Sequence, residues 1–389
     1  MNKLLLRVSS LLVLAVLTGC GDQAAAQKPA ASSPAARASD GSADVAKGLE
    51  ALEQNDPTAA MVAFTTAATK CATNFEARLQ LALVKIRLGD VPGANAAAAE
   101  ALALCPESAE ANLADGQAAY LKRDYKRALA DFDKVAKEQA LPPSLRSDAW
   151  VGRGVVELAQ SQTDAARLSF LRAKCLDGRN PAAWYHLGVL YRDALKFNHA
   201  AYEQFQMASG YMAKSNDERA RKISRDVLPS LRKAIAAEAA AKPGVAKRDP
   251  VAAAKLLKEG QTLQSSKRIT AALKKYEAAY AADPLSGAAA LAFAHLRGLN
   301  AKTQADVDKA LAAFRAASDQ DPSAQAIYRE AALLAYKHAR WSTAVAIMDR
   351  AVAHDPVNKN ALDLFIAALK KSGKGKLAES WQTYRGAVR

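Results

Sequence analysis

The sequence predicts an all-α solenoid, in which antiparallel helix pairs stack one after another in two blocks. Three regularities favour this fold: a small residue recurs at a fixed interval, an alanine follows it at a second fixed distance, and an aromatic residue occupies a third position. The small residues are separated by 34, 34, 38 and 34 positions and are Gly48, Ala82, Gly116, Gly154 and Gly188. Such a period is typical of a repeated supersecondary unit that buries its apolar face against its neighbours.

The other two positions keep the same register. The alanines lie twelve residues after the small residues, at Ala60, Ala94, Ala128, Ala166 and Ala200. The third position lies sixteen residues after the small residues and holds Phe64, Ala98, Phe132 and Phe170. In the fifth copy Phe205 and Ala208 come one residue late, which indicates one extra residue in that repeat.

After residue 250 the same pattern returns in about four copies. Its members are Gly260, Ala272, Tyr276 and Pro284, then Ala294, Ala310, Phe314 and Pro322, then Ala332, Ala344 and Pro356, with Ile366 and Ala378 in a weaker last copy. The small residues let two helices approach closely, and the aromatic residue fills the space between repeats. The proline ends the second helix of each pair.

This pattern resembles the tetratricopeptide repeat (TPR), a pair of antiparallel helices 34 residues long. The resemblance covers most of residues 43–213, an N-terminal block of about five repeats, and of residues 251–389, a C-terminal block of about four. It implies helix-turn-helix repeats stacked in a right-handed superhelix with a concave face for partner proteins.

Residues 214–250 break the period and are predicted to be a basic helical spacer between the two blocks. Ten Lys and Arg residues stand there against five Asp and Glu. A helix is expected to run towards Ala241 with a kink at Pro229. The two repeat blocks are then either one continuous rod or two hinged lobes, and we favour two lobes.

Residues 1–19 are predicted to be a lipoprotein signal peptide. Lys3 and Arg7 precede an apolar run that is too short to span a bilayer, which takes about 20 apolar residues. Residues 17–20 read Leu-Thr-Gly-Cys and resemble a bacterial lipobox. The resemblance implies that Cys20 is alkylated with diacylglycerol and becomes the mature N-terminus, whereas the alternative is an ordinary secretory signal with an incidental cysteine.

The N-terminus therefore predicts an exported protein, anchored by lipid to the outer membrane and facing the periplasm. Several acyl chains give stable anchoring. Gly21 follows Cys20, which by resemblance to Gram-negative lipoproteins favours the outer membrane, while Asp22 leaves the inner membrane open. Residues 20–42 are rich in Ala, Pro and Ser and are predicted to be a flexible tether.

The net charge of +15 points to acidic partners, anionic lipid head groups or anionic polysaccharide. Nucleic acid is not expected, because the aromatic residues fit repeat-packing positions and form no stacking platform. The five histidines form no zinc motif, no Cys-x-x-Cys pair exists, and Gly373–Lys376 lacks the spacing of a phosphate loop. We therefore predict no catalytic residue, metal, cofactor or small-molecule substrate, and no enzymatic activity.

Three cysteines remain besides Cys20. Cys71 and Cys105 occupy the same position of consecutive repeats, so a disulfide between them is one alternative in an oxidising compartment. Neighbouring repeats are displaced by about 8–10 Å, beyond the reach of a disulfide, so buried thiols are the expected state. Cys175 is expected to be buried as well.

The family resemblance also implies which residues face the concave groove. In such repeats these are the second, fifth, ninth, twelfth and thirteenth positions of the first helix, counted here with Gly116 as the eighth. In the first block they are Leu79, Leu83, Ile86, Leu113, Tyr120, Leu121, Val151, Val155, Leu158, Tyr185 and Val189. In the second block they are Leu257, Gln261, Gln264, Leu291, His295, Arg329, Leu333, Tyr336, Lys337, Asp363, Lys370 and Lys371.

The first groove is apolar and the second mixes apolar, polar and basic groups. The first is expected to accept an apolar or amphipathic segment of a partner. The alternative is that its residues pack on neighbouring helices or under the basic spacer.

The preferred function is an adaptor that binds envelope proteins during assembly of a type IV or tight-adherence pilus, a secretion system or a polysaccharide exporter. This choice rests on analogy with TPR lipoproteins of similar layout. The alternative is an adaptor for envelope proteases or peptidoglycan hydrolases, which predicts co-purification with a hydrolase.

Overall fold

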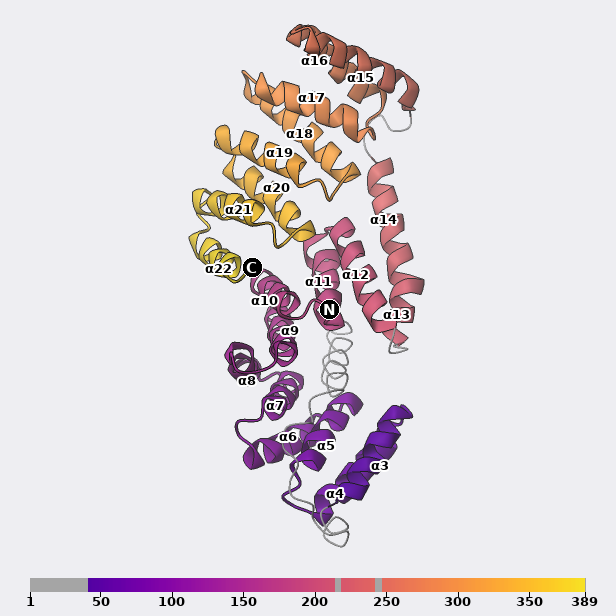
Figure 1. Cartoon of the computed structure of the whole chain (residues 1–389), viewed down its shortest axis with the longest axis vertical. Coiled ribbons are helices and arrows are strands. Elements are labelled where there is room, and N and C mark those ends of the chain that lie inside the picture. The colour runs from indigo at the N-terminus through magenta and orange to yellow at the C-terminus, as the bar shows by residue number, and fades with distance from the viewer. Residues whose placement is uncertain (1–40, 214–217, 242–246, 389) are drawn as a thin grey trace. The chain divides into compact units, whose positions relative to one another are not determined.

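The computed structural model describes residues 41–213, 218–241 and 247–388, and every regular element in these ranges is a helix. The predicted all-α fold is therefore confirmed. Figure 1 shows successive antiparallel helix pairs joined by short turns. Among the described residues, no helix is both long and apolar enough to cross a membrane.

The helices form two compact units. Unit 1 comprises Met1–Leu190 and Met207–Asp217, and unit 2 comprises Tyr191–Gln206 and Glu218–Arg389. Helix α12 (Asn198–Ala213) therefore contributes residues to both units.

In unit 1 each helix packs against the one that follows it, and first helices of neighbouring pairs also touch one another. The helices are α3 (Ser42–Glu53), α4 (Pro57–Lys70), α5 (Phe75–Leu88), α6 (Val91–Leu104), α7 (Ala109–Leu121), α8 (Tyr125–Lys137), α9 (Pro143–Ala159), α10 (Thr163–Leu176) and α11 (Pro181–Leu190). Several begin at a side chain that accepts hydrogen bonds from the first-turn N–H groups, as Asp56, Asn74, Asp90, Ser108 and Asp124 do.

The close approach of helices in unit 1 depends on glycine beside an aromatic ring. A Cβ atom at Gly116 would lie 2.9 Å from the Phe132 ring, and one at Gly152 would lie 2.6 Å from it. Phe132 is fully buried between these two glycines, which belong to its own repeat and the next. The aromatic position thus fills the space between repeats, as its register predicts.

The extra residue of the fifth repeat lies in a π-helical turn. After α11 the chain forms η1 (Tyr191–Leu195), and the N–H of Phe197 donates to the carbonyl oxygen of Tyr191 at 2.8 Å. A π turn accommodates one residue more than an α turn does. This explains why Phe205 and Ala208 come one residue late while both remain fully buried.

Unit 2 begins with η1 and the first part of α12 and continues with a second helical segment. This segment consists of α13 (Glu218–Lys222), η2 (Ile223–Val227) and α14 (Leu228–Ala240). The π turn η2 ends two residues before Pro229, which has no N–H to donate to the carbonyl of Arg225 four residues earlier. The α-helical hydrogen bonding is thus interrupted just before Pro229, while the expected kink stays a prediction.

Four helix pairs complete unit 2. They are α15 (Pro250–Ser265) with α16 (Ile269–Ala282), α17 (Gly287–Leu299) with α18 (Gln304–Gln320), α19 (Gln325–Lys337) with α20 (Trp341–His354), and α21 (Lys359–Lys371) with α22 (Gly375–Ala387). The second helices α16, α18 and α20 end two residues before Pro284, Pro322 and Pro356, as the sequence predicts.

Candidate partner-binding surfaces

The predicted groove of the first block is closed by its own side chains. Leu83, Val151 and Val155 are each 1% exposed, and Leu113 is 0% exposed. The other members divide into the buried Leu79, Ile86, Tyr120 and Val189 and the half-buried Leu121, Leu158 and Tyr185.

The cause of this burial is the direct contact between successive first helices, α5 with α7 and α7 with α9. Alanine and glycine at the packing positions bring these helices so close that their inner faces cover one another. The burial favours the alternative that these residues pack on neighbouring helices, while partner binding by them stays a prediction.

Unit 1 also has a buried acidic pair. Arg127 of α8 donates two hydrogen bonds to Asp115 of α7, from Nε at 2.9 Å and from Nη2 at 2.5 Å. Asp131 lies one turn after Arg127, and both burial and the neighbouring charge of Asp115 raise the pKa of its carboxyl. This cluster joins the two helices of one repeat through hydrogen bonds, so we assign it a structural role.

The predicted groove of the second block is exposed. His295 of α17, Arg329 and Lys337 of α19 are exposed, and Leu333 between the last two is 46% exposed. Tyr336, Leu257 and Leu291 are half-buried, and the exposed remainder are Gln261, Gln264, Asp363, Lys370 and Lys371. We call this set the first-helix face of unit 2.

Contacts within and between repeats organise this face. His295 Nδ1 lies 2.8 Å from a carboxylate oxygen of Glu330, which links α17 with α19. The ring of Tyr336 meets Trp341 edge to face, with 4.6 Å between ring centroids. Arg329 and Lys337 form no ion pair with any residue that the structure describes, so both cations are available to a partner.

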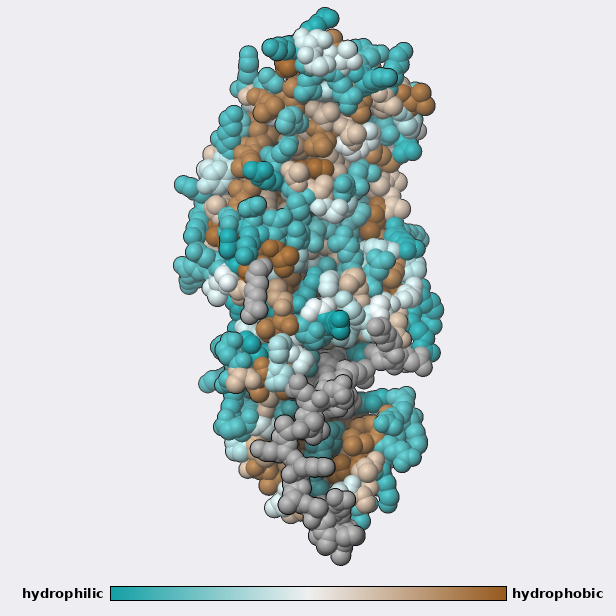
Figure 2. Space-filling model, in the orientation of Figure 1, coloured by the Kyte–Doolittle hydropathy of each residue, from teal (hydrophilic) through white to brown (hydrophobic). Residues whose placement is uncertain are grey.

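The basic charge of the protein is concentrated in unit 2. Its sequence holds 32 Lys and Arg against 18 Asp and Glu, a net charge of +14, whereas unit 1 has 22 against 21. Figure 2 shows hydrophilic side chains over much of the visible surface, with hydrophobic ones reaching it around α17 and α18. An acidic partner is therefore expected to meet unit 2 and not unit 1.

A second surface of unit 2 was not predicted from the sequence. A cavity of about 1140 Å³ lies along the second helices α16, α18 and α20, on one side, and the start of α12 and the end of α14 on the other. A further cavity of about 650 Å³ continues it between α18, α19 and α20. The two share Leu195, Phe197, Ala312, Arg315 and Arg350, and we call them together the second-helix groove.

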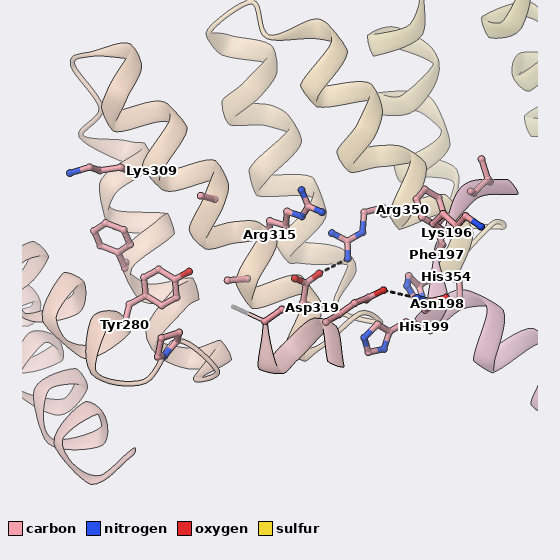
Figure 3. A pocket seen from close by; sticks show the side chains of 18 of the residues that line it. Lys196, Phe197, Asn198, His199, Tyr280, Lys309, Arg315, Asp319, Arg350 and His354 are labelled. Atoms are coloured by element: carbon pink, nitrogen blue, oxygen red, sulfur yellow. Dashed lines mark hydrogen bonds and ion pairs between the residues drawn. The ribbon is translucent and has the colours of Figure 1, made fainter. Parts of the chain in front are cut away.

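Figure 3 shows how the labelled side chains of this groove lie. Tyr280 and Lys309 are at one end, Lys196 and Phe197 are at the other, and Arg315 lies between them beside Arg350. The apolar part of the lining includes Phe197, Tyr280, Pro284 and Phe293. The groove is thus apolar along its length and carries charged groups at intervals.

Each carboxylate that lines the larger cavity is already bound. Glu238 of α14 accepts a hydrogen bond from Asn198 of α12 at 2.5 Å. Asp319 pairs with Arg350 at 2.5 Å, and Glu277 pairs with Lys309 at 3.8 Å. Among the described residues that line the larger cavity, every carboxylate therefore has a hydrogen-bond or ion-pair partner.

Burial shifts two titratable groups in this cavity. It lowers the pKa of His199, and the nearby His354 lowers it further. Burial also raises the pKa of Tyr280. Both shifts favour neutral side chains, so the hydrogen-bonding groups that His199 and Tyr280 offer near neutral pH are uncharged.

The three described cysteines correct one expectation. None of Cys71, Cys105 and Cys175 forms a disulfide, yet Cys71 is half-buried and the other two are exposed. The expectation of buried thiols was wrong because these cysteines lie at or near the ends of second helices, outside the contact between repeats. Cys20 lies outside the described residues.

The sequence and fold agree with known repeats. A family model of the tetratricopeptide repeat matches residues 79–144, 122–183 and 295–359, so the matches fall in both units. These matches cover 170 of the 389 residues, and the all-helical fold is a solenoid of the tetratricopeptide-repeat type, a fold typical of protein-interaction scaffolds. We find no curated protein whose sequence matches this chain.

Several solved structures are similar to the chain. A thermophilic TPR protein of Thermus thermophilus is 20% identical and covers 47% of this chain and 97% of its own, with a TM-score of 0.41. PilW, a type IV pilus biogenesis factor, is 18% identical over 64% of this chain and 96% of its own, with a TM-score of 0.37. The Cut9–Hcn1 hetero-tetramer of the APC/C is 14% identical over 91% of this chain and 80% of its own, with a TM-score of 0.38. With TM-scores below 0.5, none bears on what this chain binds.

Proposed function

We propose that this chain is a lipid-anchored scaffold of the cell envelope that binds partner proteins through the first-helix face of unit 2. In this proposal Cys20 carries the lipid and the tether of residues 20–42 lets the repeats reach partners on the periplasmic side of the outer membrane. The partners belong to an envelope assembly, namely a pilus, a secretion system or a polysaccharide exporter.

The observation that carries the binding role is the exposure of the first-helix face. Arg329 and Lys337 stand one on each side of the exposed Leu333 on α19, and neither cation has a carboxylate partner among the described residues. An apolar group flanked by available cations suits a protein segment with an acidic rim. The concentration of net charge in unit 2 supports the same kind of partner.

The envelope location is supported by the sequence alone. Residues 17–20 end an export-type apolar run with Leu-Thr-Gly-Cys, and this places a thiol where lipid attachment needs one. Stable anchoring through several acyl chains then supplies the membrane contact, so the repeats themselves need none.

Chemical crosslinking in membranes tests this proposal. We would compare the intact chain with Cys20→Ala and with the double variant Arg329→Glu, Lys337→Glu, and identify captured proteins by mass spectrometry. The matched control is Lys122→Glu, Lys126→Glu, which makes the same charge change at exposed residues of unit 1.

Capture of pilus, secretion or export components that is lost in the first-helix face variant and kept in the control supports the proposal. Dependence on Cys20 supports the anchor. Capture of a protease or peptidoglycan hydrolase instead assigns the chain to the adaptor alternative. Capture that survives the first-helix face variant unchanged removes that face from the proposal.

A further inference from the structure

The second-helix groove of unit 2 has the properties of a second binding site, on a different set of helices from the first-helix face. Its larger cavity of about 1140 Å³ exceeds the roughly 300–1000 Å³ of ordinary small-molecule pockets, and the cavity of about 650 Å³ extends it. An extended or helical segment of a protein fits a groove of this size better than a small molecule does.

The charged residues that line the groove differ in whether they already have a bonded partner. In its larger cavity the carboxylates Glu238, Glu277 and Asp319 are each held by a donor or cation of unit 2, and the smaller cavity adds Asp349. Arg315 and Lys196 also line the groove and are exposed, and neither forms an ion pair with a residue of the described ranges. A ligand therefore meets two cations that have no ion-pair partner, whereas Glu277 and Asp319 are already paired with Lys309 and Arg350.

The apolar lining is placed between those cations. Phe197 and Ala312 line both cavities, and Tyr280 and Phe293 line the larger one. Arg315 also lines both cavities, so a segment lying along the groove must pass it. The occupant that complements this arrangement has apolar side chains along one side and a carboxylate opposite Arg315.

We propose that the second-helix groove binds an acidic amphipathic segment of a partner protein, whose apolar face packs on Phe197 and Tyr280 and whose carboxylate pairs with Arg315. The inference rests on the proposed role as a protein-binding scaffold, but it names a surface that the first-helix face does not include. The scaffold can then hold two protein segments at once.

Selection of displayed peptides tests the proposal without knowledge of the partner. Random peptides of about fourteen residues, about four helical turns, would be selected on the full chain and their affinities measured by fluorescence anisotropy. Three variants separate the sites: Arg315→Glu in the groove, Ala312→Trp, which fills the groove without changing charge, and the control Arg329→Glu on the first-helix face. Circular dichroism confirms that each variant is folded.

We expect one class of peptides with Asp or Glu beside apolar residues spaced three or four apart. Its affinity should fall at least tenfold in Arg315→Glu and in Ala312→Trp, and stay within about twofold in Arg329→Glu. Peptides that depend only on Arg329 would support the first-helix face while overturning the groove. Peptides that depend on the groove but carry no carboxylate would also overturn the proposal. Self-association of the chain that is abolished by Ala312→Trp would overturn it too, because the occupant of the groove would then be a second copy.

Discussion

His354 of α20 lies 3.1 Å from both carboxylate oxygens of Glu203 on α12, although 151 residues separate them in the chain. The His354 side chain is only 6% exposed and that of Glu203 is 43% exposed, so the pair lies at the edge of the contact between the two helices. It connects the segment that precedes the repeats of unit 2 with the third of its four helix pairs. The wall of the second-helix groove formed by α12 is thereby fixed to the wall formed by α20.

Loss of this connection should loosen the α12 wall. Replacement of Glu203 by Gln removes the charged acceptor, and a hydrogen bond to a charged group contributes about 1.5–3 kcal/mol. We expect faster amide hydrogen exchange over residues 198–206 and an unchanged rate in α21 and α22. Asp363→Asn is the matched control, because it removes a carboxylate from the exposed pair with Arg385. Equal exchange in both variants would show that the His354–Glu203 pair does not hold α12.

Unit 1 should lose stability as pH rises, because it holds a carboxyl in its neutral form. Burial raises the pKa of Asp148 from 3.8 to about 8, opposed by a hydrogen bond from Asn180 and reinforced by Asp177. Between these two values the folded state binds one proton more than the unfolded state. The free energy of unfolding therefore falls with pH, by up to about 1.4 kcal/mol per pH unit for one proton. The raised pKa of Asp131 acts in the same direction.

Asp148→Asn should flatten this dependence, since an amide can still accept the hydrogen bond from Asn180 and carries no titrating proton. Urea unfolding of the full chain, followed by hydrogen exchange in α9 and α10 from pH 5 to pH 8, measures the slope. Asp164→Asn, at an exposed position of α10, serves as the control. If the free energy of unfolding of Asp148→Asn falls with pH as steeply as that of the intact chain, Asp148 is ionised in the folded protein.

The repeat register in the sequence was enough to predict the fold, because it reports contacts that recur. The contact of Phe132 with Gly116 is one of these, and it recurs between Phe64 and Gly48, between Phe170 and Gly154, and between Tyr276 and Gly260. Exposure of the first helices was harder to predict, because it depends on how closely neighbouring repeats approach. Leu113 and Leu333 occupy the same kind of position, yet Leu113 is 0% and Leu333 is 46% exposed.

The second-helix groove could not be predicted from the repeat pattern. Phe197 and Lys196 come from the irregular turn after η1, and Glu238 comes from α14, which lies outside the repeats. The late position of Phe205 predicts the irregular turn, but it does not predict which helices that turn faces. Such long-range placement follows from packing in three dimensions, which no local period encodes.

Charged substitutions should unfold unit 1, where the first helices are buried, and leave unit 2 folded, where they are exposed. Leu83→Glu with Leu113→Glu would place two carboxylates where exposure is 1% and 0%. Burying unpaired charges costs several kcal/mol each, so we expect unit 1 to unfold. Leu333→Glu on α19 should leave the helical circular dichroism signal unchanged. If the double variant stays folded, the inner face of unit 1 opens in solution and its groove residues regain a role in binding.

The close contact at Phe132 offers the sharpest test of the repeat packing. A Cβ atom at Gly152 would come within 2.6 Å of the ring, so Gly152→Ala must displace Phe132 or separate α8 from α9. Overpacking of this kind costs about 1–3 kcal/mol. Gly386→Ala in α22 is the control, because nothing lies within 4 Å of the added methyl group, and alanine there should stabilise the helix by up to about 1 kcal/mol. In urea denaturation we expect the free energy of unfolding to fall in Gly152→Ala and to rise in Gly386→Ala. A neutral or stabilising Gly152→Ala would mean that the repeats of unit 1 are less tightly packed than the ring contacts require.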